Sequence, residues 1–160
     1  MRRARRSSCP VNVFLEVLGD HWSLLIVRDL MFEGPCRYGE LLRAKEGIAT
    51  NILAARLRQL ETDGVIGRRR DPADARRWVY RVTQKGIDLA PIFLELSIWS
   101  ARHYRTDAPA AVMRRMTGKR KRLIAELRRQ LARARALGGA ADHDDRAHRH
   151  PLGSKGASSR

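Results

Sequence analysis

Apolar residues recur at helical intervals near the start of the chain, with polar positions between them. One set, spaced i, i+3, i+4 and i+7, predicts a helix from about Cys9 to Gly19: Val11, Phe14, Leu15 and Leu18. Pro10 suits the first position of that helix. A second helix is expected to start at an Asp20 cap and to end at the Gly34-Pro35 pair.

The middle of the chain shows two more helical patterns and then a change of period. A short helix at about 38–42 ends before Gly47, and a longer helix starts at Thr50 and stops at Gly64 as a left-handed cap. Its inward positions follow at i, i+4 and i+7: Leu53, Leu57 and Leu60. A polar loop at 71–77 then separates two β-prone runs, which predicts a hairpin of residues 65–70 and 78–82.

The last helix of this domain is expected to run from a Thr83 cap to about Tyr104, with a kink at Pro91. It is apolar on nearly every side, so it must be buried on nearly every side. A domain of roughly 95 residues covers only part of such a helix. A two-fold homodimer is therefore predicted, with these candidate interface residues: Phe14, Phe93, Leu96 and Trp99.

Composition divides the 160 residues into four segments: a basic arm at 1–8, the main domain at 9–105, a basic helical extension at 106–137 and a disordered tail at 138–160. The extension carries a thin stripe of Leu123, Leu127 and Leu131 among its cations. Two roles stay open for it. Its cations are expected to contact DNA phosphates; the alternative is that its leucines dock on the main domain or pair across the dimer.

The charge balance indicates which class of molecule the protein binds. Lys and Arg total 33 against 17 Asp and Glu, giving a net charge of +16, and +9 of it lies in residues 114–136. Such a chain suits nucleic acid. Its 43% hydrophobic content still supports a real core, and no run is long and apolar enough to cross a membrane. Only two cysteines are present, which fits a reducing cytoplasmic setting.

The predicted fold is mainly α with a small β-hairpin, in winged helix-turn-helix order. With its leucines inward, the fourth helix presents Asn51, Ala55, Arg58 and Thr62 along the opposite line. Asn can read adenine, Arg can read guanine, and Ala can contact the thymine methyl group. Arg76 and Arg77, at the expected hairpin tip, can reach phosphates or a minor groove. Taken alone, these polar side chains also fit the solvated face of any amphipathic helix.

Residues 9–103 resemble the HxlR-type winged-helix transcriptional regulators, relatives of the MarR group. The matching positions are Cys9-Pro10, Gly19, Trp22, Leu25-Ile26, Arg28, Leu30, Gly34-Pro35, Arg37-Tyr38, Glu40-Leu41, Ile48, Leu53, Arg56-Leu57, Leu60, Gly64, Tyr80, Thr83, Gly86 and Trp99. The resemblance implies a homodimer built on the first and last helices, with two recognition helices on a palindromic operator in double-stranded DNA. The wing looks more like that of the MarR group, and residues 106–160 lie outside the resemblance.

The candidate DNA-binding residues are Arg37, Thr50, Asn51, Ala55, Arg58, Arg76 and Arg77. Cys9 is a candidate redox sensor, since a helix N-terminus and nearby arginines favour the thiolate, and some similar regulators sense oxidants there. The alternative is a structural or incidental cysteine. A small-molecule effector in a dimer-interface pocket is a second possible signal.

Catalysis, a metal and a cofactor are not expected. The sequence lacks P-loop, HExxH, paired CxxC and GxSxG strings, and its histidine-rich stretch at 143–150 sits in the tail without a framework. The predicted function is therefore that of a cytoplasmic, sequence-specific transcriptional regulator. We expect a repressor rather than an activator. The rival hypothesis is an architectural protein that binds nucleic acid without sequence preference.

Overall fold

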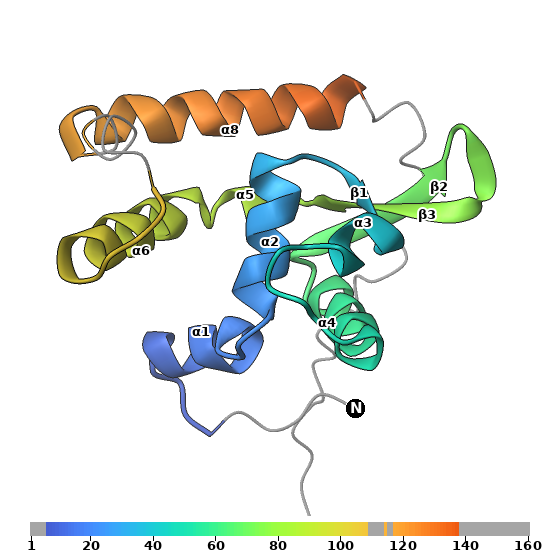
Figure 1. The fold of residues 1–160 in the computed structure, drawn as a ribbon, viewed down its shortest axis with the longest axis horizontal. Helices are drawn as coiled ribbons and strands as arrows, with labels where there is room; N and C mark the ends of the chain where they lie inside the picture. Colours follow the sequence, from blue (N-terminus) through green and yellow to red (C-terminus); the bar gives the residue numbers. More distant parts are fainter. Residues whose placement is uncertain (1–5, 109–113, 115–116, 138–160) are drawn as a thin grey trace, which may run out of the picture.

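The computed structural model describes residues 6–108, 114 and 117–137. It is mainly helical with one small antiparallel sheet, as predicted (Figure 1). In chain order the elements are α1 (Pro10–Leu18), α2 (Ser23–Phe32), β1 (Cys36–Arg37), α3 (Tyr38–Leu42), α4 (Thr50–Thr62), β2 (Ile66–Asp71), β3 (Asp74–Val82), α5 (Gln84–Ile87), α6 (Ala90–His103) and α8 (Arg120–Leu137).

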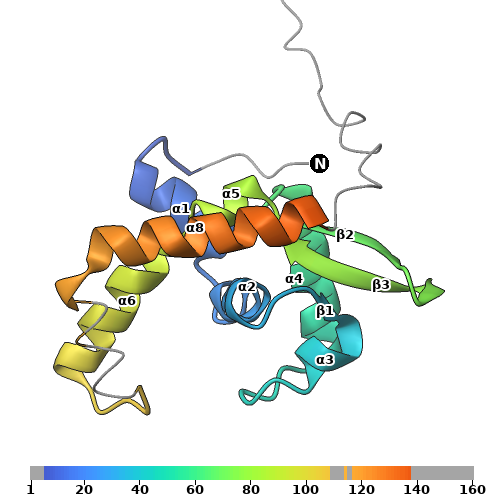
Figure 2. The ribbon, with the colours of Figure 1, turned by 90° about the horizontal axis from the view of Figure 1, so that it is seen from above.

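The core forms around α2, which runs through the middle of the molecule (Figures 1 and 2). Its Val27 and Leu30 are 0% and 1% exposed, and the inward leucines of α4 meet them in the same apolar cluster. Burial of this many aliphatic side chains is the main stabilising contribution. The core therefore holds the α3–α4 pair and the hairpin on one common support.

The helix ends follow the predicted capping residues. The Asp20 carboxylate accepts hydrogen bonds from the backbone N–H of Trp22 at 2.9 Å and of Ser23 at 3.0 Å, which caps α2. Gly64 has φ +69° after α4, a conformation that glycine adopts without steric cost. The Thr83 hydroxyl accepts from the N–H of Gly86 and caps α5. These local predictions are confirmed.

The predicted hairpin loop at 71–77 is wrong. The strands extend to Asp71 and Asp74, so only two residues turn the chain, and Arg76 and Arg77 lie within β3 rather than in a loop. The Asp71 carboxylate accepts from the N–H of Ala73 at 2.9 Å, which stabilises this short turn. A third strand, β1, also pairs with β3, and the sheet order is β1-β3-β2. Two residues are too few for a periodic signal to predict β1.

The predicted kink at Pro91 is also wrong. Instead of one bent helix, α5 ends at Ile87 and α6 begins at Ala90, with Pro91 in its first turn. Proline has no N–H to donate to the preceding turn, and its ring fits the first turn of a new helix. The change of direction between α5 and α6 lets α6 leave the body of the domain at one end (Figure 1).

The basic extension forms a helix, as predicted, and this helix packs on the domain. α8 contacts α6 and α5, and its Leu127 and Leu131 pack against the core cluster. It lies on the opposite side of α2 from α4 (Figure 1). Residues 1–5 of the predicted arm and the predicted tail at 138–160 lie outside the described residues, as does the histidine-rich stretch.

Within the described ranges, no single helix has the length and apolar character needed to span a membrane. α1 and α2 meet that criterion only when joined across a bend of 79°.

Candidate nucleic-acid interface

The outward face of α4 is a line of exposed side chains that can enter a DNA major groove. Leu53, Leu57 and Leu60 are 0–2% exposed. Because these leucines point inward, the residues on the opposite side of α4 face the solvent. All four residues placed there by the sequence are exposed: Asn51, Ala55, Arg58 and Thr62. The Thr62 hydroxyl donates to the carbonyl of Arg58 at 2.9 Å, so it is engaged by its own helix. Asn51, Ala55 and Arg58 are left as the readable set.

The N-terminal end of α4 is tied to α3 and α2. The Tyr38 hydroxyl donates to the carbonyl of Thr50 at 2.8 Å, joining the starts of α3 and α4. Arg28 donates to both carboxylate oxygens of Glu46 at 2.6 and 3.1 Å, which anchors the loop before α4 to α2. This hydrogen bonding lowers the pKa of Glu46. Such bidentate pairs fix orientation as well as position.

The C-terminal end of α4 is tied to the hairpin and α5. Lys85 donates from Nζ to the carbonyl of Asp63 at 2.6 Å, and the Thr83 hydroxyl donates to the carbonyl of Gly64 at 2.7 Å. These contacts satisfy carbonyls that a helix end leaves without partners. Because both ends are held, α4 presents its outer face at one fixed angle.

The hairpin carries a stack of cations on one face. The guanidinium carbons of Arg68 and Arg70 lie 4.4 and 3.9 Å from the ring centroid of Trp78. Cation–π contacts of this kind hold arginine side chains in place. Arg68 also pairs with the Glu61 carboxylate of α4 at 3.2 Å, so part of the charge of this stack is balanced. Sequence reasoning missed this arginine pair, although alternate arginines on one strand share a face and provide a usable signal.

Arg76 and Arg77 are exposed near the hairpin tip, with 93% and 64% of their side chains accessible. The Asp74 carboxylate lies 3.3 Å from Arg76 and 3.0 Å from Arg77, so one acid balances part of their charge. Their position at the end of the hairpin matches the sequence expectation, although they belong to β3. Their accessibility leaves them able to meet a phosphate backbone.

Arg37 has a different setting from the one that the sequence suggested. Its guanidinium donates from Nε to Asp71 at 2.5 Å, joining the start of α3 to the hairpin. This hydrogen bond lowers the pKa of Asp71, whose side chain is 5% exposed, and raises the pKa of Arg37. Arg37 therefore acts as a tether between the helix pair and the wing. Sequence reasoning missed Asp71, because no local pattern pairs positions 34 residues apart.

A cleft of about 360 Å³ opens between α3 and the hairpin. Three arginines line it from separate elements: Arg37, Arg43 and Arg77. Trp78 forms part of its wall, and Glu40 is its acidic member. A positive recess beside a helix-turn-helix can receive a DNA phosphate, since phosphate contacts position a protein on the duplex.

Only part of the predicted dimer surface is accessible. Leu96 and Trp99 are 43% and 54% exposed on α6, whereas Phe93 is 7% exposed and packs edge-to-face on Phe32 within the chain. Phe14 is half-buried against the core. α1 and α6 lie at the same end of the molecule (Figures 1 and 2). Their accessible large apolar residues are Val11, Leu15, Ile92, Leu96 and Trp99.

The two cysteines differ in exposure and in acidity. Cys9 is exposed at the start of α1, where the backbone amides of Asn12 and Val11 lower the pKa of its thiol. Cys36 is half-buried, and burial raises its pKa. Thiolate is the reactive form, so Cys9 has the more favourable setting. In the part of the chain that is described, no three His, Cys, Asp or Glu side chains are grouped closely enough to hold a metal ion.

The model of the HxlR-like helix-turn-helix family matches residues 17–108. This chain belongs to that family. It is 39% identical over 88 residues to an HTH-type transcriptional regulator, sll1512, of Synechocystis, covering 55% of this chain and 64% of that protein. The family match, together with relatives named HTH-type transcriptional regulators, confirms the predicted winged helix-turn-helix regulator and supports it over the architectural alternative.

Solved structures agree with this assignment. The crystal structure of PA1607, a candidate transcription factor, is 40% identical with a TM-score of 0.58, covering 66% of this chain and 72% of PA1607. The oxidised form of the redox regulator HypR is 30% identical with a TM-score of 0.53, covering 61% of this chain and all of HypR. The family match ends at residue 108, before α8 begins at Arg120.

Proposed function

We propose that the protein is a homodimeric transcriptional repressor that binds a palindromic operator through α4 and the hairpin. The exposed line of Asn51, Ala55 and Arg58 on a helix held at both ends is the observation that carries this proposal. Asn51 and Arg58 offer bidentate contacts to adenine and guanine. Arg76 and Arg77 reach the flanking backbone, and Arg37 holds the wing in position. Binding at a promoter excludes other proteins there.

The homodimer rests on the apolar surface shared by α1 and α6. Exposed Leu96 and Trp99 favour an isologous contact, because each copy offers the same patch to the other. A two-fold dimer then places its recognition helices about one helical turn of DNA apart, roughly 34–36 Å. Substituting Trp99 with Glu is expected to give monomers in analytical ultracentrifugation, with a large loss of operator affinity.

Selection from random duplexes, followed by competition binding, tests sequence specificity. The enriched duplex is expected to bind at least about 10³-fold more tightly than a scrambled duplex of equal length at physiological salt. Equal binding would favour the architectural alternative. A repressor is then distinguished from an activator by transcription in vitro from a promoter that contains the selected site.

Oxidation at Cys9 is the proposed signal. Cys9 is the exposed thiol whose pKa is lowered, and HypR is described as a redox regulator. Treatment with diamide is expected to release DNA from the wild-type protein and from Cys36→Ser, but not from Cys9→Ser. Equal release of DNA from all three proteins would show that the Cys9 thiol has no role in the response to diamide.

A further inference from the structure

We propose that the C-terminal helix completes a binding site for a small aromatic amine, between α8, α6 and the end of α2. The effect of such a ligand on DNA rests on the function proposed above, but its binding does not. The pocket has a volume of about 260 Å³, near the lower end of the range for small-molecule sites. Its α8 wall lies beyond the range that the family model matches.

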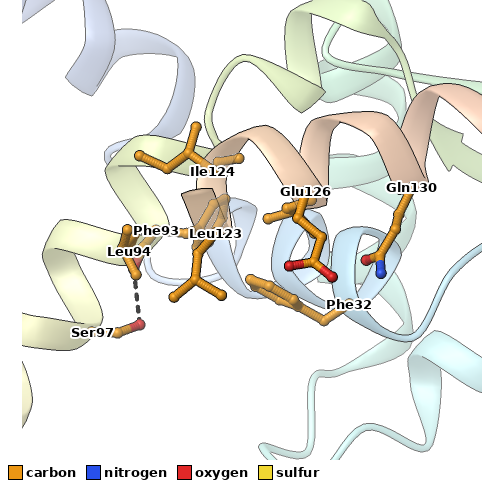
Figure 3. Close-up of a pocket in the computed structure, with 10 residues that line it drawn as sticks. Phe32, Phe93, Leu94, Ser97, Leu123, Ile124, Glu126 and Gln130 are labelled. Atoms are coloured by element: carbon orange, nitrogen blue, oxygen red, sulfur yellow. Dashed lines mark hydrogen bonds between the residues drawn. The ribbon is translucent and has the colours of Figure 1, made fainter. Parts of the chain in front are cut away.

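The walls of this pocket are mostly apolar (Figure 3). Core helices supply the aromatic pair Phe32 and Phe93, whose ring centroids lie 6.2 Å apart at 88°, together with Leu94. α8 supplies Leu123, Ile124 and Leu127. Phe32 is 51% exposed, which is costly for a large aromatic side chain unless another molecule covers it. An aromatic ring is the occupant that such walls favour.

The polar groups of the pocket point to a cationic end on that ligand. Figure 3 shows the carboxylate of Glu126 descending from α8 toward the Phe32 ring, with the amide of Gln130 beside it. The Ser97 hydroxyl is already engaged, since it donates to the carbonyl of Phe93 at 2.8 Å. Glu126 is therefore the charged group available to a ligand.

The isolation of Glu126 strengthens this inference. It is the only acid of residues 114–136, which carry ten Lys and Arg. Other cations of α8 do find acids, since Arg120 lies 3.0 Å from Glu95 and Arg128 lies 3.9 Å from Asp88. Among the described residues, no ion pair forms at Glu126. A carboxylate beside an apolar wall, left without a cation on so basic a helix, is complementary to an ammonium group.

The pocket also lies next to the two parts of the molecule that the proposed DNA binding requires, the helix-turn-helix pair and the dimer surface of α6. Phe32 is the last residue of α2, four residues before β1, and β1 leads directly into α3 of the helix-turn-helix pair. Phe93 and Leu94 belong to α6, whose other side carries the exposed dimer residues. A ligand held between them contacts both α2 and α6. Such a ligand affects DNA binding if it binds more tightly to one orientation of α6 than to another, which is the requirement for an allosteric effect.

Calorimetric titration of the full chain tests the site with three probes that share one ring system: 1-naphthylmethylamine, 1-naphthalenemethanol and 1-naphthoic acid. The amine is expected to bind at least about tenfold more tightly than the alcohol, since a charge-assisted contact exceeds a neutral one. Glu126→Gln should bring the amine to the affinity of the alcohol and leave the alcohol unchanged. Glu126→Lys should reverse the ranking of amine and acid.

Asp107→Asn is the control, because it removes an exposed carboxylate that pairs with Lys45, outside the pocket and away from α8. It should leave the ranking intact, and circular dichroism confirms that each variant keeps its helices. The proposal is overturned if no probe binds, if the amine is no tighter than the alcohol, or if Glu126→Gln and Asp107→Asn behave alike. No DNA is present, so a failure of the proposed regulator function leaves this result standing.

Discussion

α4 and α8 are both helices of leucines and arginines, yet the molecule uses them in different ways. The leucines of α4 are 0–2% exposed, whereas Leu123, Leu127 and Leu131 of α8 are only half-buried. α4 is tied at both ends by hydrogen bonds to its neighbours. α8 rests on α6 and α5 through a narrow apolar stripe, with exposed ion pairs at Arg120 and Arg128.

This difference shows that the helix with the most positive charge need not be the one that reads the DNA bases. α8 carries more cations than α4, but it lies across α2 from α4 (Figure 1). A recognition surface needs few cations on one line and a rigid mounting, because base contacts require fixed geometry. The position of α8 supports docking rather than contact with the same stretch of DNA.

The largest expected contrast is in stability. Leu53→Ala is expected to reduce the free energy of unfolding by about 2–5 kcal/mol, because the side chain is fully buried and leaves a cavity. Leu127→Ala is expected to cost only about 1 kcal/mol, because its side chain is half-buried. Urea unfolding of the full chain measures both. Equal losses would show that α8 is as much part of the core as α4.

The second contrast is in operator affinity. Arg58→Ala is expected to cost about 1–3 kcal/mol and to relax base preference at one position in each half-site. Arg129→Ala removes an equally exposed arginine from α8 and should leave the preference unchanged. Competition with single-base variants of the selected duplex decides between them. An unchanged preference in Arg58→Ala would mean that another face of α4 reads the bases.

The third test concerns the tether between Arg37 and the buried Asp71. The ion pairs of α8, at Arg120 and Arg128, are exposed instead. Arg37→Ala and Asp71→Asn should each increase hydrogen exchange in the hairpin and weaken operator binding several-fold. The double variant should be little worse than either single one, because both remove the same interaction. Additive losses would indicate two independent roles.

The same tether gives a pH dependence. Arg37 lowers the pKa of Asp71, so the contribution of the pair to stability is complete above the ordinary carboxyl pKa of about 4. It is lost as the pH falls through the lowered pKa of Asp71. As the pH falls below about 4, thermal melts of the wild type should therefore lose a contribution that the Asp71→Asn variant lacks at every pH.

The smallest expected effect is on salt dependence. A chain ending at Arg105 should bind the operator with a slope of log affinity against log salt that changes by less than about one phosphate contact, because α8 lies away from α4. Its melting temperature should fall by a few degrees as the apolar contact with α6 is lost. A clearly shallower slope at unchanged stability would restore the phosphate role for the extension.

Features set by neighbours in sequence were predictable. The outward line of α4 follows from leucines at i, i+4 and i+7, and the caps at Asp20, Gly64 and Thr83 act within three residues of their own positions. The family match followed from spaced residues across the same domain. Short-range geometry and backbone conformation suffice for such features.

Tertiary structure alone decided the rest, since it depends on which distant segments meet. Pairing with β2 as far as Asp71 and Asp74 extends β3 beyond its apolar run, so Arg76 and Arg77 lie within the strand at an irregularity in the register. Arg37 finds Asp71 across 34 residues, and Glu126 meets Phe32 only because α8 returns to the end of α2. A charge or an aromatic ring has the same local pattern whether or not a partner arrives, so only packing assigns its role.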